Sequence, residues 1–293
     1  MSFFNKYKEK QEGAIHYFDV SSPGVKIACI LIFAVCIAIT IIALFPAVWV
    51  CLASLKDIQQ FTRNPSILPD KYDFSVFVQT WNDLGFTQYY INSLISVAGS
   101  IVCAVVFNGL LGYGLGILKP KGYRVVNSLV MWCLLIPATT SLVALIANIQ
   151  RVGLDGSFIP LWLVMGANAF YVILFKQYFE QLPKSLIEAA TLDGCSDFRI
   201  FFEIILPLSM PIVVVVCIFA LTASWSDFLL PYLLLNNTEK ETVMVRLFEF
   251  RTSSANDVEV LRAIVFSIIP PAIIFALFQK QITQSVASAG IKG

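Results

Sequence analysis

The sequence predicts an all-α, polytopic membrane protein with six transmembrane helices and both termini in the cytoplasm. Of its 293 residues, 58% are hydrophobic and only 13% are charged. A soluble domain carries about 25% charged residues, so this composition indicates a chain that lies in lipid. Long apolar runs, most of them close to or above the roughly 20 residues that cross a bilayer, supply the helices. Short basic connections between the runs set their orientation.

Six apolar runs follow one another along the chain and predict the six spanning helices. The first begins near Val25. It is too long for the core of a signal peptide and no cleavage site follows it promptly, so we expect it to be retained. Prolines inside several runs predict kinked helices, which fit a protein with an internal pathway and equally fit an inert bundle. The runs cover residues 25–53, 91–118, 125–149, 157–179, 207–235 and 263–282, and the prolines are Pro46, Pro137, Pro211, Pro231, Pro270 and Pro271.

The orientation follows from the short turn between the second and third runs. This turn contains Lys119, Lys121 and Arg124, whereas the turn after the third run contains only Arg151, beside an aspartate. Because short basic loops stay in the cytoplasm, the first turn is predicted inside and the second outside. The predicted cytoplasmic parts are then the termini and the loop 180–207, and the predicted outer segments are 54–90 and 236–262.

The sequence predicts a single membrane domain and few residues that could take part in catalysis. We expect residues 1–24 to form a cytoplasmic N-terminal segment and residues 25–293 to form the six-span domain. The sequence contains no G-x-x-x-x-G-K-[ST] phosphate loop, and His16 is its only histidine. No serine, histidine and acid are therefore placed for nucleophilic chemistry, and we expect no catalytic residue. The poverty of histidine and clustered acids in the spans counts against a membrane enzyme.

Neither a metal site nor a nucleic-acid surface is expected. The seven cysteines include no C-x-x-C pair, and all but Cys195 lie in or beside apolar runs, as small buried apolar residues do. A net charge of +1 without a dense basic cluster offers nucleic acid no binding surface. Glycines with small-xxx-small spacing in the second run predict close helix packing rather than nucleotide binding. These are Gly109, Gly112, Gly114 and Gly116.

A short polar stretch, LPKSLIEAATLDGCSDFRIFFEIILPL at residues 182–208, interrupts the apolar runs. Ser185 and Glu188 have the S-x-x-E spacing of a capping box and predict the start of a helix. Gly194 fits the left-handed residue that ends one. The helix between them has about eight residues and is about 12 Å long. A helix this short is marginal in water, so another surface must hold it.

A second short helix is predicted to begin at Ser196 or Asp197, both good N-caps. Arg199 and Glu203 stand four residues apart and can pair. Helical spacing of apolar residues predicts a face that packs on the membrane bundle, while the small side chains of the first helix let another surface approach. The stretch is therefore predicted to be a docking element. The apolar face comprises Phe198, Phe201, Phe202 and Ile205, and Pro207 ends the helix or starts the next span.

This stretch resembles the cytoplasmic EAA loop in the membrane subunits of ATP-binding-cassette importers. That loop reads E-A-A, three residues, G, nine residues, I-x-L-P, and the chain matches every fixed position. The matching residues are Glu188, Ala189, Ala190, Gly194, Ile204, Leu206 and Pro207, and Asp193 adds the frequent D-G form.

Other stretches are similar to sugar-importer permeases, and the chain's ending is similar to the shorter, maltose-type partner subunit. Ser226 departs from the usual W-N-D-F, so the role of that asparagine is not carried over to it. The similar stretches are INSL at 91–94, IP at 136–137, VGLDGS at 152–157, LPKSL at 182–186, SWSDFLLPY at 224–232 and the ending FQKQITQSVASAGIKG.

The resemblance implies a multi-pass protein of the cell (inner or plasma) membrane of a prokaryote, folded as an importer-permease bundle with a cytoplasmic coupling helix. Its implied partners are a second, homologous permease, two ATPase subunits and an extracellular or periplasmic solute-binding protein. The solute-binding protein would deliver a sugar or oligosaccharide. The chain itself would perform no chemistry and need no cofactor, because ATP and Mg bind the ATPase subunits.

The resemblance also implies two sets of site residues. Glu188 would pair with a basic residue of the ATPase or only cap its own helix, and Gly194 would permit the turn. Aromatic rings stack on sugars and a carboxylate accepts from their hydroxyls, so residues of the fifth run could line the substrate pathway or simply pack. The coupling set is Glu188, Ala189, Ala190, Asp193 and Gly194, and the pathway set is Trp225, Asp227 and Tyr232.

The alternative function is that of a secondary transporter, driven by an ion gradient and acting without ATPase partners. Such a protein would have ionisable residues buried mid-span and internal repeats. The sequence shows neither clearly, since Asp227 is a single acid near the end of a span.

Overall fold

The structure is a computed structural model that describes residues 23–63, 66–252 and 256–290, and every regular element in these ranges is a helix. The predicted N-terminal segment 1–24 and the last three residues lie almost entirely outside them. Contacts divide the chain into two compact units, residues 1–71 and 72–293, and each is described by itself.

The first unit is built on one long apolar helix. α1 (Pro23–Ala53) continues through Pro46, and its most apolar window has no buried residue within the unit. α2 (Ile58–Arg63) follows, and the Gln60 side chain closes the loop behind it. The Gln60 amide donates to the Leu68 carbonyl at 3.2 Å and accepts from the Asp70 amide at 3.2 Å. The Lys56 ammonium donates to the Ser66 carbonyl in the same loop.

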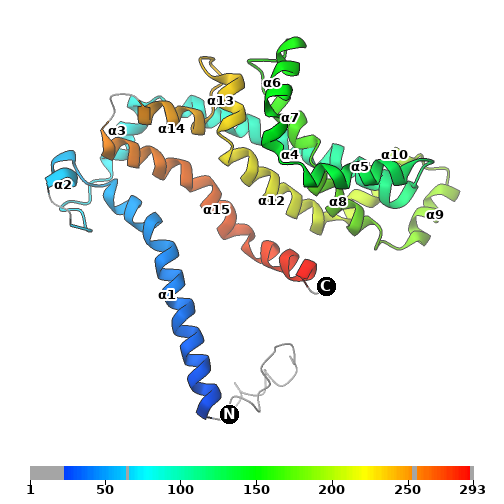
Figure 1. The fold of residues 1–293 in the computed structure, drawn as a ribbon, viewed down its shortest axis with the longest axis horizontal. Helices are drawn as coiled ribbons and strands as arrows, with labels where there is room; N and C mark the ends of the chain where they lie inside the picture. The colour runs from blue at the N-terminus through cyan, green and yellow to red at the C-terminus, as the bar shows by residue number, and fades with distance from the viewer. Residues whose placement is uncertain (1–22, 64–65, 253–255, 291–293) are drawn as a thin grey trace. The chain divides into compact units, whose positions relative to one another are not determined.

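The second unit is arranged around α4 (Phe86–Tyr113), which packs against α7, α8 and α12 (Figure 1). α4 ends in a π-turn, Gly114–Leu118. A Cβ atom built on Gly112 would lie 2.8 Å from Cβ of Phe175, closer than real carbon atoms approach. α4 and α8 therefore touch where glycine leaves room, and the close packing expected of the glycine cluster is confirmed here. The partners are α7 (Ile159–Gly166), α8 (Ala169–Phe179) and α12 (Met210–Ser226).

Within the described residues, three helices are long and apolar enough to cross a membrane alone. Three bent helix pairs raise the number to six if each pair is one span, which equals the predicted number. The single helices are Gly24–Ala53, Phe86–Leu118 and Asp257–Gln279, and the pairs are Tyr123–Leu135 with Thr139–Arg151 (94°), Ile159–Gly166 with Ala169–Phe179 (44°), and Asp197–Leu208 with Met210–Ser226 (85°).

The breaks have different causes. α5 (Tyr123–Leu135) ends at Ile136, whose ψ of 120° is the extended conformation that a following proline imposes. Pro137 therefore breaks the third run as predicted. The fourth run breaks at Ala167, where no proline lies. The fifth run bends by 85° at Ser209, two residues before the predicted kink at Pro211, and α12 then ends at Asp227. By contrast, α15 (Asp257–Gly290) continues through Pro270 and Pro271.

Shorter helices complete the second unit. They are α3 (Ser75–Asp83), a 3-10 turn (Ala138–Ser141), α6 (Leu142–Arg151), α9 (Lys184–Leu192), α10 (Asp197–Ile200), a π-turn (Phe201–Ile205), α11 (Leu206–Leu208), α13 (Leu229–Leu235) and α14 (Val243–Thr252).

Candidate functional site

The polar stretch 182–208 folds as a helix, a glycine turn and a second helix at one end of the second unit, where Figure 1 labels α9 and α10. Gly194 has φ +78°, so the predicted left-handed residue is confirmed. The Cys195 amide donates to the Ala190 carbonyl and the Gly194 amide donates to the Thr191 carbonyl, both at 3.0 Å. These two bonds form a Schellman motif, which satisfies the last carbonyls of α9 and fixes the turn.

The predicted capping box is wrong. Pro183 occupies the N-cap position, no side chain caps α9, and the helix begins at Lys184. Ser185 is thus already inside the helix and cannot cap it. The fixed φ of proline suits the start of a helix, and here α9 starts there without a side-chain cap. Among the described residues the Glu188 carboxylate has no hydrogen bond or ion pair, and it lies exposed.

The second helix is capped as predicted. The Ser196 hydroxyl accepts from the Arg199 amide at 3.4 Å. The Arg199 guanidinium pairs with Glu203 at 2.8 Å, and because both side chains are exposed this pair contributes little to stability.

One predicted apolar face is only half right. Phe201 and Ile205 are buried, but Phe198 is 68% exposed and Phe202 is 44% exposed, while Ile200 is fully buried. The π-turn Phe201–Ile205 explains the difference, because its five-residue hydrogen-bond spacing shifts which side chains point inward.

The inner side of the loop is anchored in the core of the second unit. Ala190 is 6% exposed and belongs to the same buried cluster as Phe179 and Phe201, with Ile187 and Cys195 packed against it. Of the five predicted coupling residues, Ala190 therefore points inward, and the other four lie exposed. Ala190 holds the loop in place rather than forming its outer surface.

The outer side of the loop carries apolar side chains that the described residues leave partly or largely exposed. Leu192 is 89% exposed at the end of α9, and Leu186 is 44% exposed near its start. Phe198 stands exposed just beyond the turn. We name this surface the apolar tip: Leu186, Leu192 and Phe198. The exposed carboxylates of Glu188 and Asp193 flank it along α9.

Two partly exposed ion pairs lie at the entrance to the loop. Glu180, the residue after α8, pairs with Lys119 at 3.3 Å and with Lys176 at 3.6 Å. The first pair links the end of α8 to the basic turn after α4, and such partly exposed pairs contribute little to stability.

The three predicted pathway residues lie in different surroundings. Trp225 is 4% exposed, and its indole N–H donates to the Ser267 carbonyl at 3.0 Å, so it packs within the unit. Asp227 ends α12 and lines a cavity of about 30 Å³ together with Ser100 and Ser224. Tyr232 lies half-buried with its ring centre 5.2 Å from that of Phe228.

The comparison with known families decides the chain's identity. The family model described as "Binding-protein-dependent transport system inner membrane component" matches residues 108–288. The chain belongs to this family. The family consists of membrane subunits of ABC transporters, which are permeases rather than enzymes.

Several relatives of this inner membrane component come from Bacillus subtilis (strain 168). The probable ABC transporter permease protein YurM is 32% identical over 252 residues, which cover 85% of this chain and 84% of that protein. The arabinooligosaccharides transport system permease protein AraQ is 29% identical, and the match covers 87% of this chain and 92% of that protein. The galactooligosaccharides transport system permease protein GanQ is 31% identical, and the match covers 86% of this chain and 92% of that protein.

A solved structure shares the fold. A chain of a bacterial ABC transporter involved in the import of the acidic polysaccharide alginate matches with a TM-score of 0.78 at 24% identity. The match covers 88% of this inner membrane component and 98% of that chain. The helical bundle around α4 is therefore the fold of an ABC importer permease.

A stripe of buried polar residues along α4 was missed by the sequence analysis. The Asn108 amide donates to the carbonyls of Ala104, at 2.8 Å, and Met165, at 3.0 Å, and it accepts from the Asn168 amide at 2.9 Å. Asn108 therefore satisfies the backbone where α7 and α8 break apart. The stripe comprises Asn92, Ser93, Ser96, Ser100 and Asn108.

The N-terminal end of the same stripe holds the segment before α14. The Asn92 amide donates to the carbonyls of Glu239, at 2.8 Å, and Glu241, at 2.9 Å, and the Ser93 hydroxyl accepts from the Val243 amide at 2.9 Å. The N-S pair of INSL thus anchors a distant loop. Four-residue spacing of asparagine and serine within an apolar run is the signal that could have revealed this stripe.

Proposed function

We propose that this inner membrane component is the permease subunit of an ATP-driven importer that takes up a sugar or oligosaccharide. A solute-binding protein outside the cell delivers the substrate, and a second, homologous permease completes the pathway. Two ATPase subunits drive transport and couple to this chain through the loop 180–207, which contains the EAA-like stretch. ATP and Mg bind those subunits, so the chain itself needs no cofactor.

The carbohydrate substrate is supported by the named substrates of the relatives. AraQ and GanQ carry the names of arabino- and galactooligosaccharide systems, and both cover most of this chain. Pathway roles for Trp225, Asp227 and Tyr232 belong to this proposal. Asp227 suits a hydroxyl best, because it is only half-buried and stands at a helix break, whereas the Trp225 indole is already bonded.

The observation that supports coupling is a short helix, α9, with one face anchored in the core and apolar side chains exposed on the other. α9 has nine residues, too few to be stable alone in water, and the buried Ala190 with the Schellman turn holds it on the bundle. A displacement of α9 is therefore expected to move α10, and with it α12, because the turn between α9 and α10 is fixed.

The chemistry of the apolar tip defines the surface that fits it. Each large apolar side chain moved from water into a groove contributes about 1.5–3 kcal/mol. A groove that takes Leu192 and Phe198, with cations facing Glu188 and Asp193, would bind the loop specifically. We assign this groove to the ATPase subunit, because the tip lies on the predicted cytoplasmic side.

The experiment replaces Leu192 with glutamate in the complete transporter. Leu192→Glu places a charge in the groove, so the ATPase subunits should no longer copurify with the permease and ATP-dependent uptake should fall at least tenfold, the effect of about 1.4 kcal/mol. Val152, 66% exposed at the end of α6 on the predicted outer side, supplies the control Val152→Glu.

Two outcomes would contradict the proposal. Normal copurification and uptake with Leu192→Glu would show that the apolar tip is not the coupling surface. Uptake that persists when the ATPase subunits are absent would favour the transporter driven by an ion gradient.

A further inference from the structure

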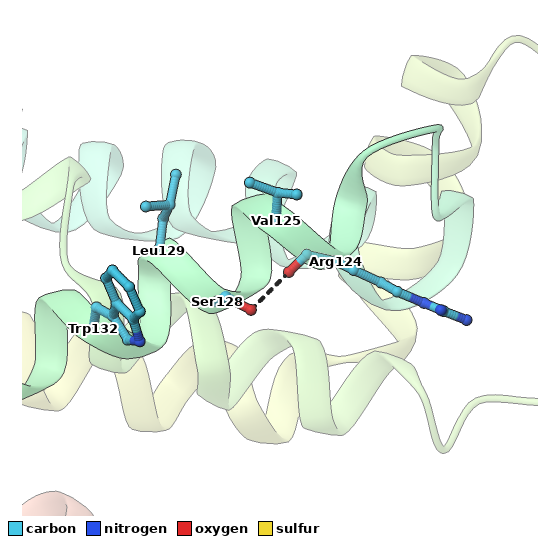
Figure 2. Close-up of a pocket in the computed structure, with 5 residues that line it drawn as sticks. All are labelled: Arg124, Val125, Ser128, Leu129 and Trp132. Carbon is cyan, nitrogen blue, oxygen red and sulfur yellow. Dashed lines mark hydrogen bonds between the residues drawn. The ribbon is translucent and has the colours of Figure 1, made fainter.

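One face of α5 is apolar and open. α5 packs against α8 and against the π-turn Gly114–Leu118 with its other side. Val125, Leu129 and Trp132 are 65%, 53% and 66% exposed. Together with Arg124 and Ser128, these residues line a groove of about 280 Å³ (Figure 2).

The Ser128 hydroxyl hydrogen in this groove is already used within α5. The Ser128 hydroxyl donates to the Arg124 carbonyl at 3.0 Å, one turn earlier in the same helix, as the dashed line in Figure 2 shows. A sugar or a water-filled pathway would favour polar groups that are available to it. The groove instead presents a surface that suits hydrocarbon.

The groove ends in a cationic turn. In Figure 2 the Arg124 side chain extends away from Trp132, past the start of the helix. Its guanidinium lies 5.9 Å from the ring centre of Tyr123, and its Nε donates to the Tyr123 hydroxyl at 3.5 Å. Within the part of the chain that the structure describes, no carboxylate lies within 4.0 Å of the Arg124 or Lys121 side chains. The positive charges of Arg124 and Lys121 at this end of α5 are therefore not neutralised by a neighbouring carboxylate among the described residues.

The length of the groove matches one leaflet of a bilayer. Arg124 and Trp132 are eight residues apart, which is about 12 Å along a helix. Half of the hydrocarbon core of a bilayer is about 15 Å thick. A headgroup at the cationic turn would thus place an acyl chain along Val125, Leu129 and Trp132.

We propose that this groove binds an anionic phospholipid of the cytoplasmic leaflet. Arg124 and Lys121 hold the phosphate, and the apolar side chains of α5 hold the upper part of an acyl chain. The surplus of positive charge selects an anionic over a zwitterionic headgroup. The proposal requires that the chain is inserted in a membrane with the basic turn after α4 on the cytoplasmic side, and it stands whether or not the coupling and substrate proposals hold.

Fluorescence quenching in the assembled transporter tests the proposal. The complex is reconstituted into vesicles of phosphatidylcholine and phosphatidylglycerol in equal parts, with bromine on the acyl chains of one lipid or the other. The signal of Trp132 is the difference between the wild-type protein and the Trp132→Phe variant. Brominated phosphatidylglycerol is expected to quench this signal more strongly than brominated phosphatidylcholine.

Charge variants identify the headgroup site. One cation near the membrane surface contributes about 1 kcal/mol, so Arg124→Gln should lower the preference for phosphatidylglycerol about fivefold. Arg124→Lys should keep most of it, and added salt should weaken it. Arg151→Gln, at the other end of the same bent pair, is the matched control and should leave the preference unchanged.

Three results would overturn the proposal. Equal quenching by the two lipids would show ordinary lipid contact without a binding site. A preference that survives Arg124→Gln would place the headgroup elsewhere. The absence of any quenching of Trp132 in the complex would show that protein, such as the second permease, covers this face.

Discussion

At the scale of the residue, Gly194 shows how one backbone position fixes the turn between α9 and α10. A Cβ atom built on Gly194 would have no neighbour within 4 Å, so space does not demand glycine here. The backbone does, because φ +78° is a conformation that other L-residues adopt only at a cost. The Schellman bonds of the turn depend on that conformation.

We expect Gly194→Ala to loosen the loop without disturbing the bundle. The left-handed conformation costs a residue with a Cβ atom about 1–2 kcal/mol, which raises the open population of the loop about 5- to 30-fold. Trypsin cleavage after Lys184 or Arg199 should accelerate by a similar factor in the purified complex. Gly194→Asn should fall between, because asparagine tolerates this conformation. Identical cleavage of all three proteins would contradict the role given to Gly194.

A second residue-scale effect concerns acid on the predicted outer side. Glu241 is 6% exposed, and its Oε1 accepts from the Asn237 amide at 2.8 Å. Burial raises the pKa of this carboxyl above its ordinary 4.5, and Glu249 adds to the rise, while the Asn237 amide and Arg246 oppose it. The folded protein therefore holds this proton more tightly than the unfolded chain does.

The sign of the pH dependence follows from this difference. As pH rises from about 4.5 through the raised pKa, the unfolded chain loses the proton first, and the contribution of Glu241 to stability falls. Glu241→Gln keeps the acceptor oxygen without the charge. Its thermal midpoint should exceed that of the wild type at neutral pH, and the gap should close below about pH 4.5. Glu239→Gln, at an exposed neighbour, should open no gap. A constant gap for Glu241→Gln would refute this account.

At the scale of the element, local signals were predictable and signals from a distant helix were not. Pro137 and the Gly194 turn act on their own backbone, so their effects could be predicted from the sequence. The break at Ala167 depends on Asn108, almost 60 residues earlier. The inward shift of Ile200 depends on a π-turn that no residue type announces. The capping box failed because Pro183, two residues earlier, starts the helix itself.

The break between α7 and α8 gives the element-scale prediction. Asn108→Leu leaves the Met165 carbonyl and the Asn168 amide without their partner. A buried group without a partner costs about 1–3 kcal/mol, so the thermal midpoint should fall. Asn127→Leu on α5 is the matched control, because the side-chain oxygen Oδ1 of Asn127 is buried and has no hydrogen-bond partner among the described residues. That variant should be neutral or stabilising. An equal loss in both variants would show that Asn108 does not hold the break.

At the scale of the whole molecule, composition and hydrophobic runs were enough to predict a helical membrane protein. The EAA-like pattern was enough to point to the family that the comparison then identified. The exposed surface of the loop 182–208 could not be predicted, because it depends on which side of α9 packs against the core. Ala190, which the pattern places among the coupling residues, is used by the core, and Leu192 faces outward instead. Family patterns record that a position matters without recording which surface it serves.

The orientation of the spans is the whole-molecule prediction. The basic turn after α4 is predicted inside, and the segment before α14 is predicted outside. Lys121 and Glu239 have exposed side chains in these two places, so each can be replaced by cysteine in a variant whose seven native cysteines are removed. In intact cells whose surface is accessible, a membrane-impermeant maleimide should label Glu239→Cys and not Lys121→Cys. Opening the cells should make both reactive. Labelling of Lys121→Cys before opening would reverse the orientation, and it would move the apolar tip of the coupling loop away from any ATPase in the cytoplasm.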